Sequence, residues 1–359
     1  MKLTHPNEQT RARLLEHCQS YPDLQAQDVF KYLYHSALGC EHLVSDEQAA
    51  LRYIEAEYAT LPDSAQDAIE PLDGAYSRVH LGMLRHGLQP RTLARLFYLS
   101  AQTEADGKAL LAQKLRVAQE MVQNRELSLD EADFAQKLDA WRAANFPAIH
   151  HSEAFRTAYH PAYRVVSNRY TAYLPLFAAI DKLLCNGSAI VSIDGGSASG
   201  KTTLASLLAQ VYDCNVFHTD DFFLQPHRRT PKRLAEIGGN LDRERFADQV
   251  LRSVCKQESV KYQRFDCSTQ TLGERITVPH NALTVIEGAY SLHPSFGQYC
   301  HLAVFLDVDP ATQRERITKR NTPAFAQRFF DEWIPLENAY FSGTNIRDRV
   351  DMIFLARDE

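Results

Sequence analysis

One short stretch constrains the fold of this chain more than any other. It reads Asp194-Gly195-Gly196-Ser197-Ala198-Ser199-Gly200-Lys201-Thr202-Thr203 and contains the pattern G-x-x-x-x-G-K-[ST]. Glycines let the backbone curl so that successive amide groups point inward at an anion. The pattern therefore predicts a loop that holds phosphate groups, formed by Gly195, Gly196, Ser197, Ala198, Ser199, Gly200, Lys201, Thr202 and Thr203.

The flanking residues support this interpretation over a glycine-rich turn that matches the pattern by chance. Residues 189–193 are apolar and β-branched, which predicts a buried strand, and residues 203–209 have a helical pattern. A strand, a glycine turn and a helix form the context that the motif requires. The positive end of the helix dipole then faces the phosphates. We expect Lys201 to reach the β- and γ-phosphates and the Thr202 hydroxyl to ligate Mg²⁺.

The length of 359 residues predicts two domains. We expect a helical domain of unknown role over 1–160, a connecting helix over 161–185 and a domain built around the phosphate-binding loop over 186–359. In the last region short apolar runs alternate with helical patterns. The predicted strands are 189–194, 215–219, 283–287, 301–307 and 351–356.

This alternation indicates the α/β class, with a P-loop NTPase parallel sheet covered by helices on both faces and preceded by an all-α N-terminal domain. In such sheets ligands bind at the carboxyl ends of the strands.

Charge and composition exclude several classes of protein. The net charge of −6 argues against a nucleic-acid-binding protein, and no apolar run is long enough to cross a membrane. The seven cysteines are scattered and odd in number, which favours reduced thiols and a cytoplasmic location. A homo-oligomer is left open.

In the N-terminal region, Leu111, Leu115, Ala118 and Val122 recur at helical spacing. Ser128 to Glu131 match a capping box, followed by a helix with Phe134, Leu138 and Trp141 on one face. We expect a turn over 70–74. Residues 76–80 could form a polar patch on a helix, but simple packing is the favoured interpretation. The domain could select substrate, recruit a partner or hold a dimer together.

Several residues of this region could in principle ligate a metal, but no pair has the spacing of a defined motif. We therefore favour ordinary core or surface roles for His35, Cys40, Glu41, His42, His80 and His86.

Phosphoryl transfer also requires a metal carboxylate and a group that takes the proton of the acceptor. Asp220 and Asp221 follow a predicted strand, so one suggests a base and the other a metal ligand. Glu287 ends an apolar strand and is a second candidate beside the metal. Helix capping is the ordinary alternative for each acid.

A basic helix follows the N-cap Asp309, and it carries Arg314, Arg316 and Arg320. Arg316 and Arg320 are four residues apart and share a face. Such a helix can close over the transferring phosphate as a lid, and a solvated cationic face is the alternative.

The acceptor pocket has weaker candidates. Asp242 lies in a loop that enters a helix, where it could bind an acceptor hydroxyl or cap the helix. Tyr262, Arg264 and Asp266 lie in a predicted loop that mixes polar and aromatic residues, as acceptor pockets often do.

Together these segments resemble the uridine kinase/nicotinamide riboside kinase/phosphoribulokinase group of P-loop kinases. The segments are IDGGSASGKTT, HTDDFF, GGNLDRERF, VIEGAYSL and LDVDPATQRERITKR, and the resemblance covers residues from about 186 onward. It implies that Asp220 is the catalytic base, that Glu287 supports Mg²⁺, that Arg314, Arg316 and Arg320 form the lid, and that Asp242 binds ribose hydroxyls. Residues 163–166 and 174–177 are also similar to bacterial uridine kinase-like proteins with a helical front.

The leading hypothesis is a kinase that uses ATP and Mg²⁺ to phosphorylate a small-molecule hydroxyl acceptor. Its catalytic residues would be Asp220, Lys201 and Arg316. The alternative is a nucleotide-sensing regulator that binds a protein partner. A third hypothesis is that the helical domain over 1–160 is itself catalytic. A switch-type GTPase is disfavoured because no N-K-x-D motif is present.

Overall fold

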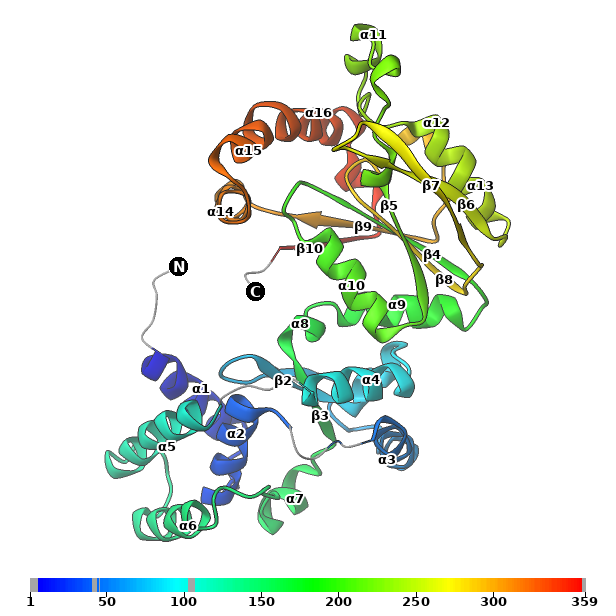
Figure 1. Ribbon diagram of the computed structural model, residues 1–359. Helices are drawn as coiled ribbons and strands as arrows, with labels where there is room; N and C mark the ends of the chain where they lie inside the picture. Colours follow the sequence, from blue (N-terminus) through cyan, green and yellow to red (C-terminus); the bar gives the residue numbers. More distant parts are fainter. Residues whose placement is uncertain (1–5, 41–43, 45, 103–106, 357–359) are drawn as a thin grey trace. The chain divides into compact units, whose positions relative to one another are not determined.

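The computed structural model describes residues 6–40, 44, 46–102 and 107–356, which form two compact units (Figure 1). The units are Met1–Ala178 and Ala179–Glu359, and the division falls within α9 (Leu174–Leu184). Each unit has its own hydrophobic core, so each is described separately below.

The first unit is predominantly helical, as expected. Its helices are α1 (Pro6–Ser20), α2 (Ala26–Leu38), α3 (Glu47–Ala59), α4 (Pro90–Ala101), α5 (Gly107–Gln123), α6 (Glu131–Ala143), α7 (Glu153–Tyr159) and α8 (Asn168–Thr171). Helix α2 is buried along most of its length and packs against α5 and α6. Phe134, Leu138 and Trp141 of α6 are buried on one face, as predicted.

The first unit is not entirely helical, however. It contains an antiparallel sheet in the order β1-β2-β3, built from β1 (Ile69–Pro71), β2 (Tyr76–His80) and β3 (Tyr163–Ser167). Residues 76–80 therefore do not form the helical patch that we considered. They form a fully buried strand, which agrees with the favoured interpretation of simple packing. Local periodicity missed it because β2 pairs with β3, which lies far along the chain.

The predicted capping box before α6 is also wrong. The N-cap is Asp130, whose carboxylate accepts a hydrogen bond from the amide of Asp133. Aspartate satisfies a free amide at a helix start as well as serine does, so the local pattern leaves two candidate caps.

One buried carboxylate ties the start of α2 to the start of α7. Oδ1 of Asp28 accepts from Nδ1 of His151 at 2.8 Å and from the amide of Ser152 at 2.9 Å. Its Oδ2 accepts from the Ser152 hydroxyl at 2.6 Å and from the amide of Gln25 at 2.9 Å. Burial disfavours ionisation, but these hydrogen bonds outweigh it and hold the pKa of Asp28 below its usual value.

The second unit is built on a five-stranded parallel sheet in the order β10-β9-β4-β8-β5. The strands are β4 (Ala189–Gly195), β5 (Cys214–His218), β8 (Leu283–Glu287), β9 (Leu302–Asp307) and β10 (Met352–Leu355). All five predicted strands are confirmed to within one residue at each end.

Helices cover both faces of this sheet (Figure 1). Helix α10 (Lys201–Val211) packs against β4, β5 and β8. On the other face, Ile190, Phe217 and Ile286 share a core with Phe246 and Tyr340 of the covering helices. The remaining helices of the unit are α11 (Pro231–Leu234), α12 (Arg243–Phe246), α13 (Arg252–Cys255), α14 (Pro310–Arg320), α15 (Pro323–Arg328) and α16 (Ile334–Thr344).

The segment predicted as a polar loop around Tyr262 is instead part of a hairpin. It pairs β6 (Val260–Asp266) with β7 (Thr271–Val278), and the register shifts between Gln263 and Phe265. This irregularity interrupts the alternation of buried and exposed residues, so the strand has no clean period of two.

Among the residues described, no helix has the length and apolarity needed to cross a membrane, and no group of three or more His, Cys, Asp or Glu side chains is arranged to hold a metal ion. Glu41 and His42, which we listed as metal candidates, lie outside the described residues. All seven cysteines are free thiols.

We predict that Asp28→Ala destabilises the first unit by at least about 3 kcal/mol, because it leaves buried donors of Gln25, His151 and Ser152 without an acceptor. Urea unfolding followed by the fluorescence of Trp141 measures the change. The control is Asp139→Ala, which removes an exposed acid of α6 and should cost less than about 0.5 kcal/mol. Equal free energies of unfolding for the two variants would contradict a stabilising role for the buried Asp28 carboxylate.

Candidate functional site

The phosphate-binding motif forms the turn between β4 and α10. Gly195 has a φ of 150°, and a Cβ there would lie 2.3 Å from the carbonyl oxygen of Leu306 in β9. Gly200 has a φ of 97° and is the N-cap of α10. Both positions require glycine, one through close packing and the other through its left-handed backbone.

The residue before the loop anchors it. Asp194 is fully buried, and its Oδ1 accepts from the amide of Gly195 at 2.7 Å. Its Oδ2 accepts from the amide of Leu292 at 3.0 Å and from the hydroxyl of Tyr340 in α16 at 2.8 Å. Burial raises the pKa of Asp194, and these hydrogen bonds oppose that effect. The loop is thereby fixed to α16 and to the segment after β8.

Three side chains hold the carbonyl groups of the loop. Nζ of Lys201 donates to the carbonyl oxygen of Gly196 at 2.9 Å. From α14, Gln313 donates to the carbonyl of Ser197 at 2.8 Å and Arg316 to the carbonyl of Ala198 at 3.1 Å. These side chains hold the loop through its carbonyl groups. Among the loop amides, that of Gly195 donates to Asp194 and that of Ser199 donates to the carbonyl of Gly196.

An acid that the sequence analysis missed contacts the loop from α16. Glu337 accepts from the amide of Ser197 at 2.8 Å and from its hydroxyl at 2.6 Å. The side chain is buried, which raises the pKa of Glu337, while nearby Lys201 lowers it. No motif marks this residue, because it lies more than a hundred positions after the loop.

Two further residues meet at the carboxyl ends of the strands. Oε1 of Glu287 accepts from the hydroxyl of Thr202 at 3.0 Å and from Nδ1 of His218 at 2.5 Å. The parallel register explains this meeting, since Glu287 in β8 pairs with Ile193 in β4 and with His218 in β5. His218 was not predicted, although it precedes the paired acids by two residues.

Asp220 and Asp221 lie on the short 3₁₀ turn Thr219–Phe222 that follows β5. Asp220 is exposed to solvent, although the protein atoms around its carboxylate desolvate it. This desolvation raises the pKa of Asp220, as do the charges of Glu287 and Asp221, whereas Lys201 lowers it. Lys201 and Glu287 are thus close enough to Asp220 to influence its ionisation.

The carboxylate of Asp221 has a different neighbour. Its Oδ2 lies 3.1 Å from Nε of Arg264 in β6. Desolvation raises the pKa of Asp221, and Arg264 lowers it. The ion pair gives Asp221 a partner that a metal ion would have to share.

The arginines of α14 separate into two groups. Arg316 contacts the loop, as described above. The guanidinium of Arg314 lies over the ring of Phe330 at 4.1 Å, and that of Arg320 over Phe329 at 5.5 Å. These cation–π contacts place Arg314 and Arg320 against the residues between α15 and α16.

The acceptor candidates have structural partners. Asp242 is buried, caps α12 through the amide of Arg245 and pairs with Arg228 at 2.5 Å. Tyr262 is buried and stacks on Phe222. The carboxylate of Asp266 accepts from residues 268 and 269 in the hairpin turn. Arg264 and Asp266 are both exposed, and Arg264 lies beside Asp221.

The loop, its flanking strand and helix, and the parallel sheet define the second unit as an α/β domain with the P-loop fold. No protein-family model and no curated protein sequence matches the chain.

Solved structures similar to it include a possible uridine kinase from Bacillus stearothermophilus, with 22% identity and a TM-score of 0.38. That match covers 50% of this chain and 99% of the other. A proposed fructose transport system kinase from Silicibacter sp. TM1040 has 19% identity and a TM-score of 0.37, with 49% of this chain and 97% of that one covered.

The contact between His218 and Glu287 predicts a pH-dependent contribution to stability. The hydrogen bond to Glu287 raises the pKa of His218, and partial burial opposes it. A raised pKa in the folded state means that the contact stabilises the protein below the unfolded pKa of about 6.5. This stabilisation is lost as the pH rises through the higher folded pKa.

Thermal unfolding of wild type and His218→Ala between about pH 5.5 and pH 9 tests this prediction. The difference in Tm between them should be largest at the acidic end and shrink as the pH rises. A difference that grows with pH would show that the charged histidine does not stabilise the site.

Proposed function

We propose that the second unit is a kinase that transfers the γ-phosphate of ATP to a hydroxyl group of a small metabolite such as a nucleoside, a sugar or a related alcohol. One observation carries the proposal. The lysine of the phosphate loop, a hydroxyl–carboxylate pair and an acid with a raised pKa lie together at the carboxyl ends of β4, β8 and β5. Phosphoryl transfer requires this combination of groups.

The nucleotide would bind through the loop amides and Lys201. In the structure Nζ of Lys201 contacts a carbonyl of its own loop, so it is already held beside the cradle and needs only to exchange that partner for phosphate oxygens. Arg314 and Arg320 would join the nucleotide site if α14 moved toward it as a lid. Arg316 already lies against the loop, where its charge would offset the negative charge of the transition state.

The side chains of Thr202 and Glu287 fit a Mg²⁺ ion, because a hard cation prefers hydroxyl and carboxylate oxygens. Such an ion would neutralise the phosphate charges when bound. His218 holds the Glu287 carboxylate in place, and Asp221 is a further candidate for the ion's surroundings. In this proposal His218 and Asp221 help to position the ion and its ligands, and neither of them transfers a proton.

Asp220 would act as the base. As the acceptor oxygen attacks the γ-phosphorus, the hydroxyl proton passes to the Asp220 carboxylate, and the bond from the γ-phosphorus to the β-phosphate oxygen breaks to release ADP. A raised pKa suits this task, since it makes the carboxylate a better proton acceptor. Arg264, Asp242, Tyr262 and Asp266 remain the candidates for holding the acceptor, and of these Arg264 and Asp266 are exposed.

Asp220→Asn should keep the affinity for ATP within about twofold and lower kcat by about 10²- to 10⁴-fold, because only the proton acceptor is removed. An ADP-release assay with nucleosides, sugars and polyols as acceptors measures the change. Asp213→Asn serves as the control, since Asp213 is exposed and precedes β5 at the opposite end of the strand.

Undiminished transfer by Asp220→Asn would remove Asp220 as the base. ATP binding without turnover on any acceptor would contradict the kinase proposal and favour a nucleotide-sensing regulator.

Glu337→Gln should bind ATP about three- to tenfold more tightly, equivalent to roughly 1 kcal/mol. The substitution keeps an acceptor for Ser197 and removes a negative charge that would face the triphosphate. Titration calorimetry with a non-hydrolysable ATP analogue measures the affinity. Glu332→Gln, at an exposed position, is the control. Weaker binding by Glu337→Gln would show that the carboxylate supports the loop instead of competing with phosphate.

A further inference from the structure

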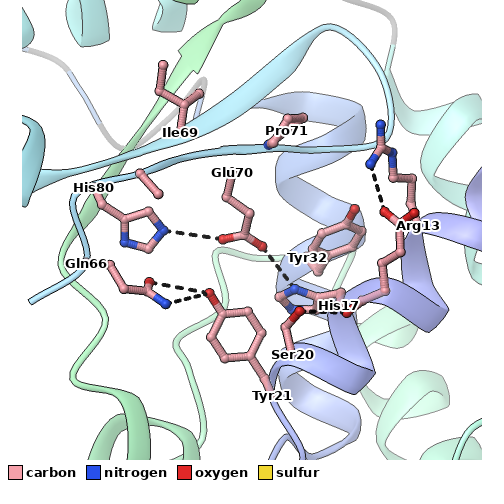
Figure 2. Close-up of a pocket in the computed structure, with 12 residues that line it drawn as sticks. Arg13, His17, Ser20, Tyr21, Tyr32, Gln66, Ile69, Glu70, Pro71 and His80 are labelled. Carbon is pink, nitrogen blue, oxygen red and sulfur yellow. Dashed lines mark hydrogen bonds and ion pairs between the residues drawn. The ribbon is translucent and has the colours of Figure 1, made fainter.

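The first unit contains a cavity of about 310 Å³ between α1, α2 and the strands β1 and β2 (Figure 2). Its wall combines aromatic rings, apolar side chains and polar groups. The lining residues used below are His17, Tyr21, Tyr32, Gln66, Glu70 and His80. The proposed kinase reaction uses none of them.

Glu70 lies at the centre of the polar wall, where Figure 2 shows His17 and His80 directed at its carboxylate. Nδ1 of His17 is 3.0 Å from Oε1, and Nε2 of His80 is 3.5 Å from Oε2. Behind them, Nη1 of Arg78 donates to both carboxylate oxygens at 3.3 and 3.4 Å. Glu70 is therefore contacted by three groups, one from α1 (His17) and two from β2 (Arg78 and His80).

The charges of this cluster balance. Burial opposes ionisation of Glu70, but Arg78 and the two histidines outweigh it and hold the pKa of Glu70 well below its usual range. Burial lowers the pKa of His17, so its imidazole is neutral. The cavity thus presents an ionised carboxylate whose charge is offset by the guanidinium of Arg78.

The Arg78 guanidinium lies over the rings of Tyr32 and Tyr163, yet several polar atoms of the cluster have no hydrogen-bond partner in the part of the chain that the structure describes. Nε2 of His17 and both Nε and Nη2 of Arg78 are buried without a hydrogen-bond partner among the described residues. A buried nitrogen without a protein partner costs free energy unless a water molecule or a ligand bonds to it. The side chains of His17, Arg78 and His80 are no more than 5% exposed, whereas that of Glu70 is 20% exposed. The carboxylate is thus the member of the cluster open to a ligand.

The other walls define what could sit beside this carboxylate. The rings of Tyr21 and Tyr32 form an aromatic wall with His17 packed between them at 4.8 and 4.3 Å. The Tyr21 hydroxyl and the Gln66 amide are 3.4 Å apart, a long contact that leaves both able to bond a ligand.

We propose that this cavity binds a small neutral sugar or polyol, whose hydroxyl groups donate to Glu70 and bond to Gln66 and the Tyr21 hydroxyl while its carbon face packs on the aromatic wall. A fixed carboxylate is a strong acceptor for hydroxyl donors. The volume lies at the lower end of the roughly 300–1,000 Å³ typical of small-molecule sites, so it suits a monosaccharide better than a nucleotide.

Charged ligands fit less well. An anion would face the Glu70 carboxylate, and a cation would approach the buried positive charge of Arg78 directly behind it. The site is independent of the proposed kinase reaction, because it is formed entirely by residues of the first unit.

Titration calorimetry on the full chain tests the proposal, with D-ribose, D-fructose, D-glucose and myo-inositol as neutral probes and phosphate and choline as charged ones. At least one neutral probe should bind. Glu70→Gln should weaken that binding at least about tenfold, since a hydrogen bond to a charged acceptor is lost. Tyr21→Phe, which removes one hydroxyl and keeps the ring, should weaken it several-fold even if Glu70→Gln fails to fold.

Tyr53→Phe is the matched control, because Tyr53 is 74% exposed on α3, and it should bind as wild type does. Three results would overturn the proposal: binding of no neutral probe, binding that both Glu70→Gln and Tyr21→Phe leave unchanged, or binding of phosphate or choline in place of the neutral probes. The first two results would overturn the proposal whether or not the second unit is a kinase, because neither variant changes a residue of that unit.

Discussion

Three parallel strands, β4, β8 and β5, are hydrogen-bonded in a register that sets Ile193, Glu287 and His218 side by side. The glycine loop begins two residues after Ile193, and the paired acids begin two residues after His218. Because parallel strands end at the same edge of a sheet, groups from distant parts of the chain arrive at one place. The hydrogen bond between Thr202 and Glu287 is the direct outcome of this register.

The loop depends equally on the C-terminal helices. Tyr340 bonds to the buried Asp194 before the loop, Glu337 bonds to Ser197 within it, and Arg316 holds a loop carbonyl from α14. A movement of these helices would change the contacts of the loop, which is the physical basis on which a lid could act. A loop that binds phosphate does not require an acidic neighbour, so the contact between Glu337 and Ser197 is an additional feature of this protein.

Much of the second unit could be predicted from the sequence, because its strands are short apolar runs buried on both faces and its loop is a motif with strict backbone requirements. What could not be predicted depends on distant contacts. Glu337 and His218 carry no local signal, and β2 and β3 pair across a long stretch of chain. Asp242 shows a further limit, since its residue type suits a ligand contact and a helix cap alike, and the structure uses it as a cap.

A crystal structure of the protein with a non-hydrolysable ATP analogue and Mg²⁺ would test the central claim most directly. The account predicts that the triphosphate lies in the loop, that Lys201 contacts the γ-phosphate, that the ion lies beside Thr202 and Glu287, and that the Asp220 carboxylate faces the space next to the γ-phosphate. A triphosphate bound away from the loop, or an Asp220 carboxylate turned from that space, would contradict it.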